Sequence, residues 1–382
     1  MSINILIVIG SLERGGTETH LLRVLPSLDR EKFNITVFCF AKDGELSNQM
    51  KEQGIKVVSP PLFIQDLQKP LLSKAMKFTW AAVKFIILLR KMKIDIVHFF
   101  LPTSYKLFTP LSFSRFNLKR VMSRRGLNRS SKKSTLSIYS YERYLHHLMD
   151  RISANSNAVA KELINEGAPS ELVQIIYNGV KESPIAINQR RDIRSELNIP
   201  EDHLLLVIVA NLIPYKGHKD LLFACHKIQS KKWHLLIVGG GNQNERSNLE
   251  NMATYLKIST KVRFLGSRPD VSHILKGCDI GILASHEEGF SNAILEGMSA
   301  GLPMIVTDVG GNSEAITHGT TGVIVPPNSP ESMAAALNYL IENPNKRIQL
   351  GQNAERRVKK YFSIDKCIEG YESLYLDVFR KH

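Results

Sequence analysis

Short apolar runs that alternate with helical patterns limit what this chain can fold into. Leu204–Ala210 contains only apolar residues, and Ile3–Ile9 contains one polar residue, Asn4. Strands that are apolar on both sides are typical of parallel sheets with helices on both faces. Because such strands alternate with helical patterns along the chain, we predict an α/β protein built on parallel sheets.

This alternation runs through the first half of the chain and then starts again. In the first half we predict strands at Ile3–Ile9, Asn34–Phe40, Val57–Val58, Asp95–Phe99 and Val121–Ser123, with helices at Thr17–Leu28, Leu71–Met92 and Ser134–Met149. In the second half we predict strands at Leu204–Ala210, Leu235–Val238, Val262–Leu265, Ile280–Ala284, Met304–Val306 and Val323–Val325, with helices at Asp220–Ile228, Asn292–Ala300 and Pro330–Ile341.

The restart predicts two Rossmann-like, doubly wound domains that face each other across a cleft, residues 1–180 and 181–360. We interpret Asn178–Asn188 as the linker, because it holds Gly179 and Pro184 and few apolar residues. In the last segment, 361–382, a helix at Ile364–Phe379 carries one apolar face. That face needs a partner, and we expect it to pack back on the first domain.

The composition is that of an ordinary globular protein in a reducing compartment. Hydrophobic residues make up 43% and charged residues 23%, which excludes a disordered chain. The four cysteines are scattered without a CxxC pair, so we interpret them as reduced core thiols. The N-terminus shows no leader pattern, and the longest apolar stretch, Phe78–Leu89, is interrupted by Lys84. We therefore expect a cytoplasmic protein without a spanning helix.

The segment from Ser285 to Pro303 carries the most chemistry. Glu288 lies at a strand-to-helix turn, and Glu296 lies eight positions later inside the helix. The helix begins around Gly289, Phe290, Ser291 and Asn292. Free backbone N–H groups at such a start suit a diphosphate, and Ser291 and Asn292 are natural caps. Taken singly, Glu288 could be a loop charge and Glu296 a solvated helix residue. Glu296 has apolar neighbours, however, so it needs a polar partner, and a ribose diol would serve.

Two other loops follow predicted strands. Lys216 lies in the turn after Leu204–Ala210, where it could neutralise a phosphate or be an ordinary surface lysine. Gly15 and Gly16 follow the first strand, where glycines let the backbone approach a ligand closely. The run Gly239–Gly241 is similar, but Asn244 stands where G-x-G-x-x-G requires its third glycine, which argues against a dinucleotide dehydrogenase.

The segment around Glu288 resembles the E-x7-E motif of glycosyltransferase family 4, the retaining enzymes with the GT-B fold. The resemblance extends to Glu288-Gly289-Phe290, Glu296, Ala300–Pro303, Gly310-Gly311-Asn312 and Glu314. It implies that Glu288 contacts the donor sugar and Glu296 holds the nucleotide ribose. It also implies that Lys216 contacts the donor diphosphate, with Asn211 where the family usually has Arg. The loop at Gly15 and Gly16 would face the donor across the cleft.

The resemblance is weaker on the acceptor side. His98 matches a histidine that the family often carries after this strand, although Phe100 stands where a second one is common. Arg124 or Arg125 stands where the family frequently has an active-site histidine. We take His98, Arg124 and Arg125 as acceptor-side candidates. For His98 a purely structural role remains open.

The excess of Lys and Arg over Asp and Glu bears on which partners the protein binds. Lys and Arg exceed Asp and Glu by 14, with basic segments at Lys74–Lys93 and Arg115–Lys133. The first segment also holds Phe78, Trp80, Phe85 and Ile86. This mixture favours either a membrane-surface helix or a core helix with a charged outer side, and the second segment could simply be a solvated loop. With the resemblance, we expect a lipid-linked saccharide as acceptor and peripheral contact with the inner face of an anionic membrane.

Taken together, the sequence predicts transfer of a sugar from a nucleotide-sugar, which we expect to be a UDP-sugar. We expect no cofactor and no essential metal, because no D-x-D pair or His/Cys set is present. Gly-x-Ser-x-Gly and P-loop motifs are also absent. Two alternatives stay open: another GT-B enzyme, such as a nucleotide-sugar epimerase or a phosphorylase, and a basic nucleic-acid-binding protein. The second lacks a nucleic-acid motif, so we expect no nucleic-acid partner.

Overall fold

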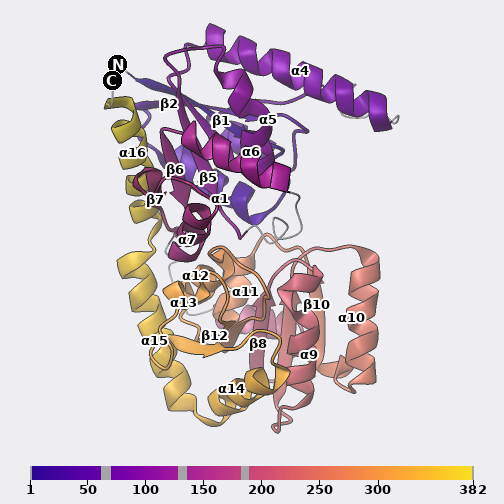
Figure 1. The fold of residues 1–382 in the computed structure, drawn as a ribbon. Coiled ribbons are helices and arrows are strands. Elements are labelled where there is room, and N and C mark those ends of the chain that lie inside the picture. The colour runs from indigo at the N-terminus through magenta and orange to yellow at the C-terminus, as the bar shows by residue number, and fades with distance from the viewer. Residues whose placement is uncertain (1, 62–69, 128–135, 182–188, 381–382) are drawn as a thin grey trace. The chain divides into compact units, whose positions relative to one another are not determined.

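The computed structural model describes residues 2–61, 70–127, 136–181 and 189–380. It divides into two compact units (Figure 1). Unit 1 comprises Met1–Asn178 and Ile364–His382, and unit 2 comprises Gly179–Ser363. The linker predicted at Asn178–Asn188 lies in part, residues 182–188, outside the described residues.

Unit 1 is built on a parallel seven-stranded sheet with the order β3-β2-β1-β4-β5-β6-β7. The strands are β1 (Ile3–Ile9), β2 (Phe33–Cys39), β3 (Lys56–Val58), β4 (Ile96–Phe100), β5 (Lys119–Arg124), β6 (Arg151–Ala154) and β7 (Val173–Ile175). The order reverses between β1 and β4, and the loops beyond the carboxyl ends of strands at such a point are where doubly wound sheets bind ligands.

Helices cover both faces of this sheet. They are α1 (Gly16–Val24), α2 (Ser47–Glu52), α4 (Pro70–Lys91), α5 (Pro102–Ser112), α6 (Leu136–His147), α7 (Asn157–Asn165) and α16 (Ile364–Arg380), with short 3-10 turns at Leu25–Ser27 and Ser170–Leu172. Successive residues of β1 enter two different cores: Ile5 and Ile7 meet α1 and α16, whereas Leu6 and Val8 meet α4, α5 and α7. This alternation is what a strand with two covered faces must show.

The C-terminal helix α16 belongs to unit 1 and lies along its sheet (Figure 1). Its buried residues include Tyr371, Leu374, Tyr375 and Val378, the apolar face that the sequence predicts. The tyrosines reach polar partners inside the unit, so the helix is fixed by hydrogen bonds as well as by apolar burial.

Unit 2 is built on a parallel six-stranded sheet with the order β10-β9-β8-β11-β12-β13. The strands are β8 (Leu204–Val209), β9 (Trp233–Val238), β10 (Val262–Gly266), β11 (Ile280–Leu283), β12 (Met304–Thr307) and β13 (Gly322–Val325). The helices are α8 (Gln189–Glu196), α9 (His218–His226), α10 (Gln243–Tyr255), α11 (Val271–Gly277), α12 (Asn292–Ser299), α13 (Asn312–Ala315), α14 (Pro330–Glu342) and α15 (Pro344–Tyr361), with 3-10 turns η4 (Pro214–Lys216) and η5 (Ser259–Lys261).

The order of this second sheet reverses between β8 and β11. The prediction of two Rossmann-like, doubly wound parallel sheets is therefore confirmed. The four cysteines are buried and form no disulfide bond, as expected for core thiols. No helix in the described part of the chain is long and apolar enough to cross a membrane.

Candidate active site

The candidate donor site lies in unit 2, at the carboxyl ends of β8 and β11. The loop after β8 carries Lys216, and the loop after β11 carries Glu288. Since the strand order reverses between these two strands, their loops open the position where a doubly wound sheet binds its ligand. The topology thus brings together two residues that are 72 positions apart in the sequence.

Lys216 and Glu288 form a direct ion pair. Lys216 Nζ donates to Glu288 Oε1 at 2.7 Å, and Ser285 Oγ donates to the same oxygen at 2.7 Å. The Lys216 and Glu288 side chains are 18% and 11% exposed, so the pair is shielded yet open to solvent at one side. The site therefore holds one cation and one carboxylate that neutralise each other.

Two glycines let the surrounding loops approach each other. Gly217 adopts a φ of +70°, and a Cβ there would lie 1.9 Å from Ala284 O. Gly310 adopts a φ of +54°, and a Cβ there would lie 1.8 Å from Glu288 O. Side chains at these positions would collide with backbone, so only glycine permits the loops after β8 and β12 to close on the Glu288 loop.

A second polar contact joins the same two loops. His286 Nε2 lies 2.7 Å from Asp220 Oδ2 in the first turn of α9, and the His286 N–H donates to Tyr215 O at 2.7 Å. Thr307 Oγ1 donates to Ser285 O at 2.5 Å from β12. The roles of His286 and Asp220 were not predictable from sequence, because neither residue carries a local signal of its partner.

Ser291 occupies the N-cap position of α12, but its hydroxyl accepts no hydrogen bond from the helix. The expected serine cap is therefore absent, and no serine hydroxyl competes for the first-turn N–H groups, which start at Asn292. Phe290 is buried and its ring lies 5.3 Å from that of Phe362. Gly289 O accepts from Gly311 N at 2.9 Å. Phe290 and Gly289 thus fix the start of the helix.

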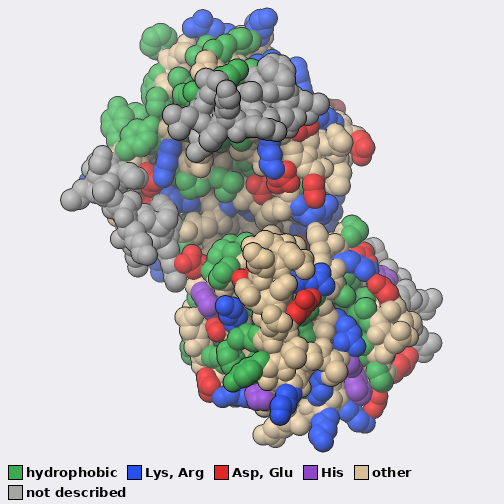
Figure 2. All heavy atoms as spheres, turned by 90° about the vertical axis from the view of Figure 1, so that its right-hand side faces the viewer, with side chains coloured by type: hydrophobic (Ala, Val, Ile, Leu, Met, Phe, Trp, Pro, Cys, Tyr) green, Lys and Arg blue, Asp and Glu red, His purple; other side chains and the backbone are tan. Residues whose placement is uncertain are grey.

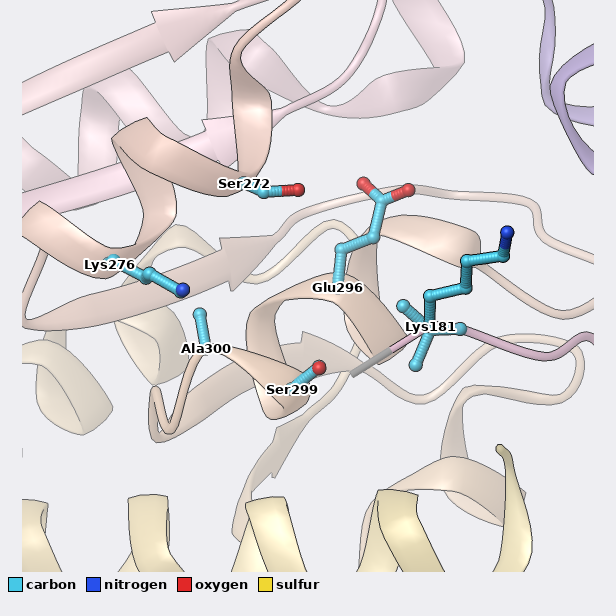
Figure 3. A pocket seen from close by; sticks show the side chains of 7 residues that line it. Lys181, Ser272, Lys276, Glu296, Ser299 and Ala300 are labelled. Atoms are coloured by element: carbon cyan, nitrogen blue, oxygen red, sulfur yellow. The ribbon is translucent and has the colours of Figure 1, made fainter. Parts of the chain in front are cut away.

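Glu296 lines a small pocket one turn further along α12. The pocket is shallow and is bordered by Lys181, Ser272, Lys276 and Ser299. In Figure 3 the Glu296 carboxylate extends along the pocket between Ser272 and Lys181. The pocket therefore brings the Glu296 carboxylate together with two serine hydroxyls and two lysine ammonium groups.

Asn211 is exposed directly after β8, beside the glycine run. A Cβ on Gly240 would lie 4.0 Å from Asn211 Oδ1, and Gly239 passes against Ala210 O. Leu212 N donates to Gly240 O at 2.7 Å, so the two segments are joined. The predicted role of Asn211 on a diphosphate stays a prediction.

The acceptor-side candidates lie in unit 1, where His98 is buried. His98 Nδ1 lies 2.9 Å from Tyr375 Oη, and its Nε2 lies 2.7 Å from Ser123 Oγ. Burial lowers the pKa of His98 to about 3, and the charge of Arg125 acts in the same direction. The ring is therefore neutral at ordinary pH, and its contacts are those of the structural role that the sequence left open.

The two arginines after His98 differ in their surroundings. Arg124 is buried and its Nη2 lies 2.8 Å from Glu166 Oε2. Arg125 is half-buried: its Nη1 donates to Tyr371 Oη at 3.2 Å and its Nη2 to Asn178 Oδ1 at 2.6 Å. Of the three acceptor-side candidates, Arg125 alone is partly exposed to solvent.

Gly15 and Gly16 form the N-cap and first residue of α1, in the loop after β1 where the strand order of the sheet reverses.

The second basic segment is only partly a surface feature. Arg120 is buried, donates to Ser112 Oγ at 2.7 Å, and stacks 3.9 Å above the Phe113 ring. With Arg124 also buried, two of its cations serve the interior, which corrects the interpretation of the segment as a solvated loop. Arg129, Lys132 and Lys133 lie outside the described residues. Within the described ranges, no cluster of His, Cys, Asp and Glu could hold a metal.

Comparisons with known proteins agree with this fold. Residues 14–183 match the model of Glycosyltransferase Family 4, and residues 189–357 match that of Glycosyl transferases group 1. N-acetyl-alpha-D-glucosaminyl L-malate synthase of Bacillus anthracis is 30% identical over 228 residues, 58% of this chain and 59% of that protein. D-inositol 3-phosphate glycosyltransferase of Thermobispora bispora is 29% identical over 224 residues, 56% of this chain and 52% of that protein.

The matched parts span only a little over half of these two relatives. The fold is also that of solved structures. The crystal structure of Anabaena HepE in complex with UDP superposes with a TM-score of 0.83 and 22% identity, covering 99% of this chain and 100% of that one. The two family models together account for both units, and the chain belongs to the group 1 glycosyltransferases of family 4.

Proposed function

We propose that this protein is a retaining glycosyltransferase that moves a sugar from a nucleotide-sugar, a UDP-sugar, to an acceptor hydroxyl. The observation that carries this proposal is the Lys216–Glu288 pair at the strand reversal of unit 2, in the loop that leads to the start of α12. A cation and the start of a helix suit a diphosphate. A carboxylate that lies 2.7 Å from this cation suits the hydroxyl groups of the sugar.

The proposed roles follow from placement. Lys216 and the first-turn N–H groups of α12 stabilise the charge that develops on the leaving diphosphate. Glu288 orients the sugar, and Glu296 accepts hydrogen bonds from the ribose diol. The acceptor oxygen attacks the anomeric carbon on the face from which the diphosphate leaves, and the leaving oxygen takes the acceptor proton. No protein base and no metal ion is required.

Two named proteins support the donor class. Anabaena HepE, which has this fold, has been solved in complex with UDP and with UDP-glucose. The relative from Bacillus anthracis is named for an N-acetylglucosaminyl transfer. These proteins favour a nucleotide-sugar over an oligonucleotide as the ligand of this chain.

A panel of nucleotide-sugars in a thermal unfolding assay tests the proposal. We expect one or more UDP-sugars to raise the unfolding temperature of the protein, while oligonucleotides of matched charge leave it unchanged. Stabilisation by oligonucleotides alone would contradict the assignment. With a turnover substrate in hand, NMR of the first-formed product decides the stereochemistry, since an inverted linkage would rule out retention.

For the acceptor we propose a lipid-linked saccharide of surface polysaccharide or glycan synthesis, reached by peripheral docking of unit 1. Residues 67–141 contain 16 Lys and Arg and a single acidic residue, Asp95, so this stretch carries the basic excess of the chain. Exposed apolar side chains lie in the same stretch: Met76, Phe78, Val83, Ile87, Leu107, Phe113 and Phe116. Figure 2 shows hydrophobic side chains beside Lys and Arg at the top of unit 1, the end where Figure 1 places α4.

A second candidate is a small anionic acceptor in solution. The two relatives are named for L-malate and for D-inositol 3-phosphate, both of which are anions. The half-buried Arg125, held by Tyr371 and Asn178, offers a cation of the right kind in unit 1. Salt-dependent binding to anionic vesicles favours the lipid-linked acceptor, and turnover of a soluble anion without vesicles favours the second candidate.

A further inference from the structure

The Lys216–Glu288 pair has a consequence for donor selection, because each partner occupies the place of a ligand group. Lys216 Nζ, the cation that would meet a diphosphate, donates to Glu288 at 2.7 Å. Glu288 Oε1, which would meet sugar hydroxyls, accepts from both Lys216 and Ser285. The two opposite charges of the site therefore satisfy each other.

The backbone around the pair is fixed, so the contact does not depend on two loose side chains. Gly217 lies against Ala284 O, and Gly310 lies against Glu288 O. The His286 N–H donates to Tyr215 O, next to Lys216, and the ring of His286 contacts Asp220. Whatever binds must therefore separate the two side chains and not the two loops.

Separating the side chains has an asymmetric cost. A nucleoside diphosphate would take Lys216 and leave the Glu288 carboxylate beside its own negative charge, with Ser285 as its remaining partner. A free sugar would take Glu288 and leave Lys216 without its anion. Breaking a shielded pair by removing one partner is unfavourable, because the other charge is left uncompensated. An intact nucleotide-sugar supplies both an anion and hydroxyl donors, and satisfies both residues.

From this geometry we infer that Lys216 and Glu288 together make the site selective for the intact nucleotide-sugar over its nucleoside diphosphate. Glu288 thereby determines specificity as well as orienting the sugar. After the bond between the anomeric carbon and the diphosphate is broken and the sugar has moved to the acceptor, Glu288 recovers Lys216, which weakens the hold on the leaving nucleotide. This inference rests on the proposed function, because it takes the diphosphate of a nucleotide-sugar as the anion.

The variant Glu288→Gln tests this selectivity. This variant keeps an oxygen for the Ser285 hydrogen bond but removes the charge that competes for Lys216 and repels the diphosphate. By isothermal titration calorimetry, UDP should bind the variant about three- to tenfold more tightly than it binds the wild type. Uridine, which has no phosphate, should bind both proteins equally. Product inhibition of any residual turnover by UDP should strengthen in parallel.

Glu331→Gln is the matched control, because Glu331 pairs with Lys227 at 2.7 Å in the same unit but is well exposed. It should leave UDP affinity unchanged, and the unfolding temperatures of both variants establish that they are folded. Equal or weaker UDP binding by a folded Glu288→Gln variant would overturn the inference while leaving the proposed function intact. If the wild type binds neither UDP nor another nucleoside diphosphate, the proposed function fails and the inference fails with it.

Discussion

His286 Nε2 lies 2.7 Å from Asp220 Oδ2, and this contact joins the loop after β11 to the first turn of α9. Both side chains are about three-quarters shielded from solvent. A hydrogen bond to a charged group in such a position contributes on the order of 1 kcal/mol to stability. The contact therefore stabilises the arrangement in which Glu288 and Lys216 meet.

The first prediction concerns this contact. His286→Ala should lower the unfolding temperature of the protein by about 2–4 °C. It should also reduce turnover more than nucleotide affinity, because Glu288 loses its fixed position. A double-mutant cycle with Asp220→Ala should give a coupling free energy of about 0.5–1.5 kcal/mol. Additive effects of the two substitutions on the free energy of unfolding would show that the contact does not contribute to stability.

The second prediction separates the two glutamates of the donor site. Glu296→Ala should weaken nucleotide-sugar binding, because the pocket at α12 loses its carboxylate. Glu288→Ala should abolish transfer while the protein stays folded. Circular dichroism and a transfer assay check both outcomes, with the exposed Glu342→Ala as a matched control that should behave as wild type. Full activity in both active-site variants would refute the placement of the donor.

The third prediction is that transfer needs no divalent metal. Lys216 and the start of α12 supply the positive charge that a metal would otherwise provide on a diphosphate. Activity should survive exhaustive treatment with EDTA. Activity that is lost on chelation and returns with Mg²⁺ or Mn²⁺ would contradict the prediction.

Most strands were predictable from their apolar runs, whereas two short strands with few apolar residues were not. Ile3–Ile9 coincides with β1, and Leu204–Ala210 differs from β8 by one residue. The prediction missed β6 (Arg151–Ala154) and β7 (Val173–Ile175), which hold too few apolar residues to give a periodic signal. It also missed α15, which is largely polar and owes its position to packing on its own unit.

Site residues were predictable where they follow strands, but their partners were not. Lys216 and Glu288 were identified as separate candidates, and their pairing depends on a tertiary contact across 72 positions. The contacts of His98 were not predictable from sequence either. Its buried environment is completed by Tyr375, 277 positions away, on a helix that returns from the C-terminus. No local sequence pattern indicates which face of β4 is covered by α16.

The fourth prediction follows from the buried histidines of unit 1. Burial lowers the pKa of His98 to about 3, and that of His20 well below its usual value. The folded state therefore binds fewer protons than the unfolded state below pH 6.5, so stability is fully present above that pH and falls toward pH 3. Each histidine should contribute up to about 1.4 kcal/mol of loss per pH unit in that window.

Urea unfolding between pH 7 and 5, above the main range of carboxylate titration, measures this slope. His98→Gln should flatten it, since the glutamine can hydrogen-bond but does not titrate. His147→Gln, at an exposed position on α6, should leave the slope as it is in the wild type. A wild-type stability that does not change over this range would show that the buried histidines do not titrate as argued.

The last prediction tests the membrane contact of unit 1. On α4 the exposed Val83 and Ile87 lie on one side, opposite the buried Phe85 and Leu89. The loop after α5 approaches the same helix, because Arg115 Nη1 donates to Leu89 O at 2.6 Å. Phe116, next to Arg115, is 93% exposed. The two elements together therefore present apolar side chains within a basic stretch, the combination that binds an anionic interface.

We expect the protein to co-sediment with anionic vesicles at low salt and to be released as salt rises. Phe116→Ser should weaken this binding about tenfold or more, because burying a Phe side chain is worth about 1.5–3 kcal/mol. Changing Lys77 and Lys84 to Glu should weaken it further, at about 1 kcal/mol for each lost cation and more for the added repulsion. Tyr255→Ser, at an aromatic residue 82% exposed in unit 2, is the matched control and should leave vesicle binding unchanged. Equal loss in Phe116→Ser and Tyr255→Ser would mean that binding is not localised to unit 1, and binding to neutral vesicles alone would exclude the electrostatic part of the contact.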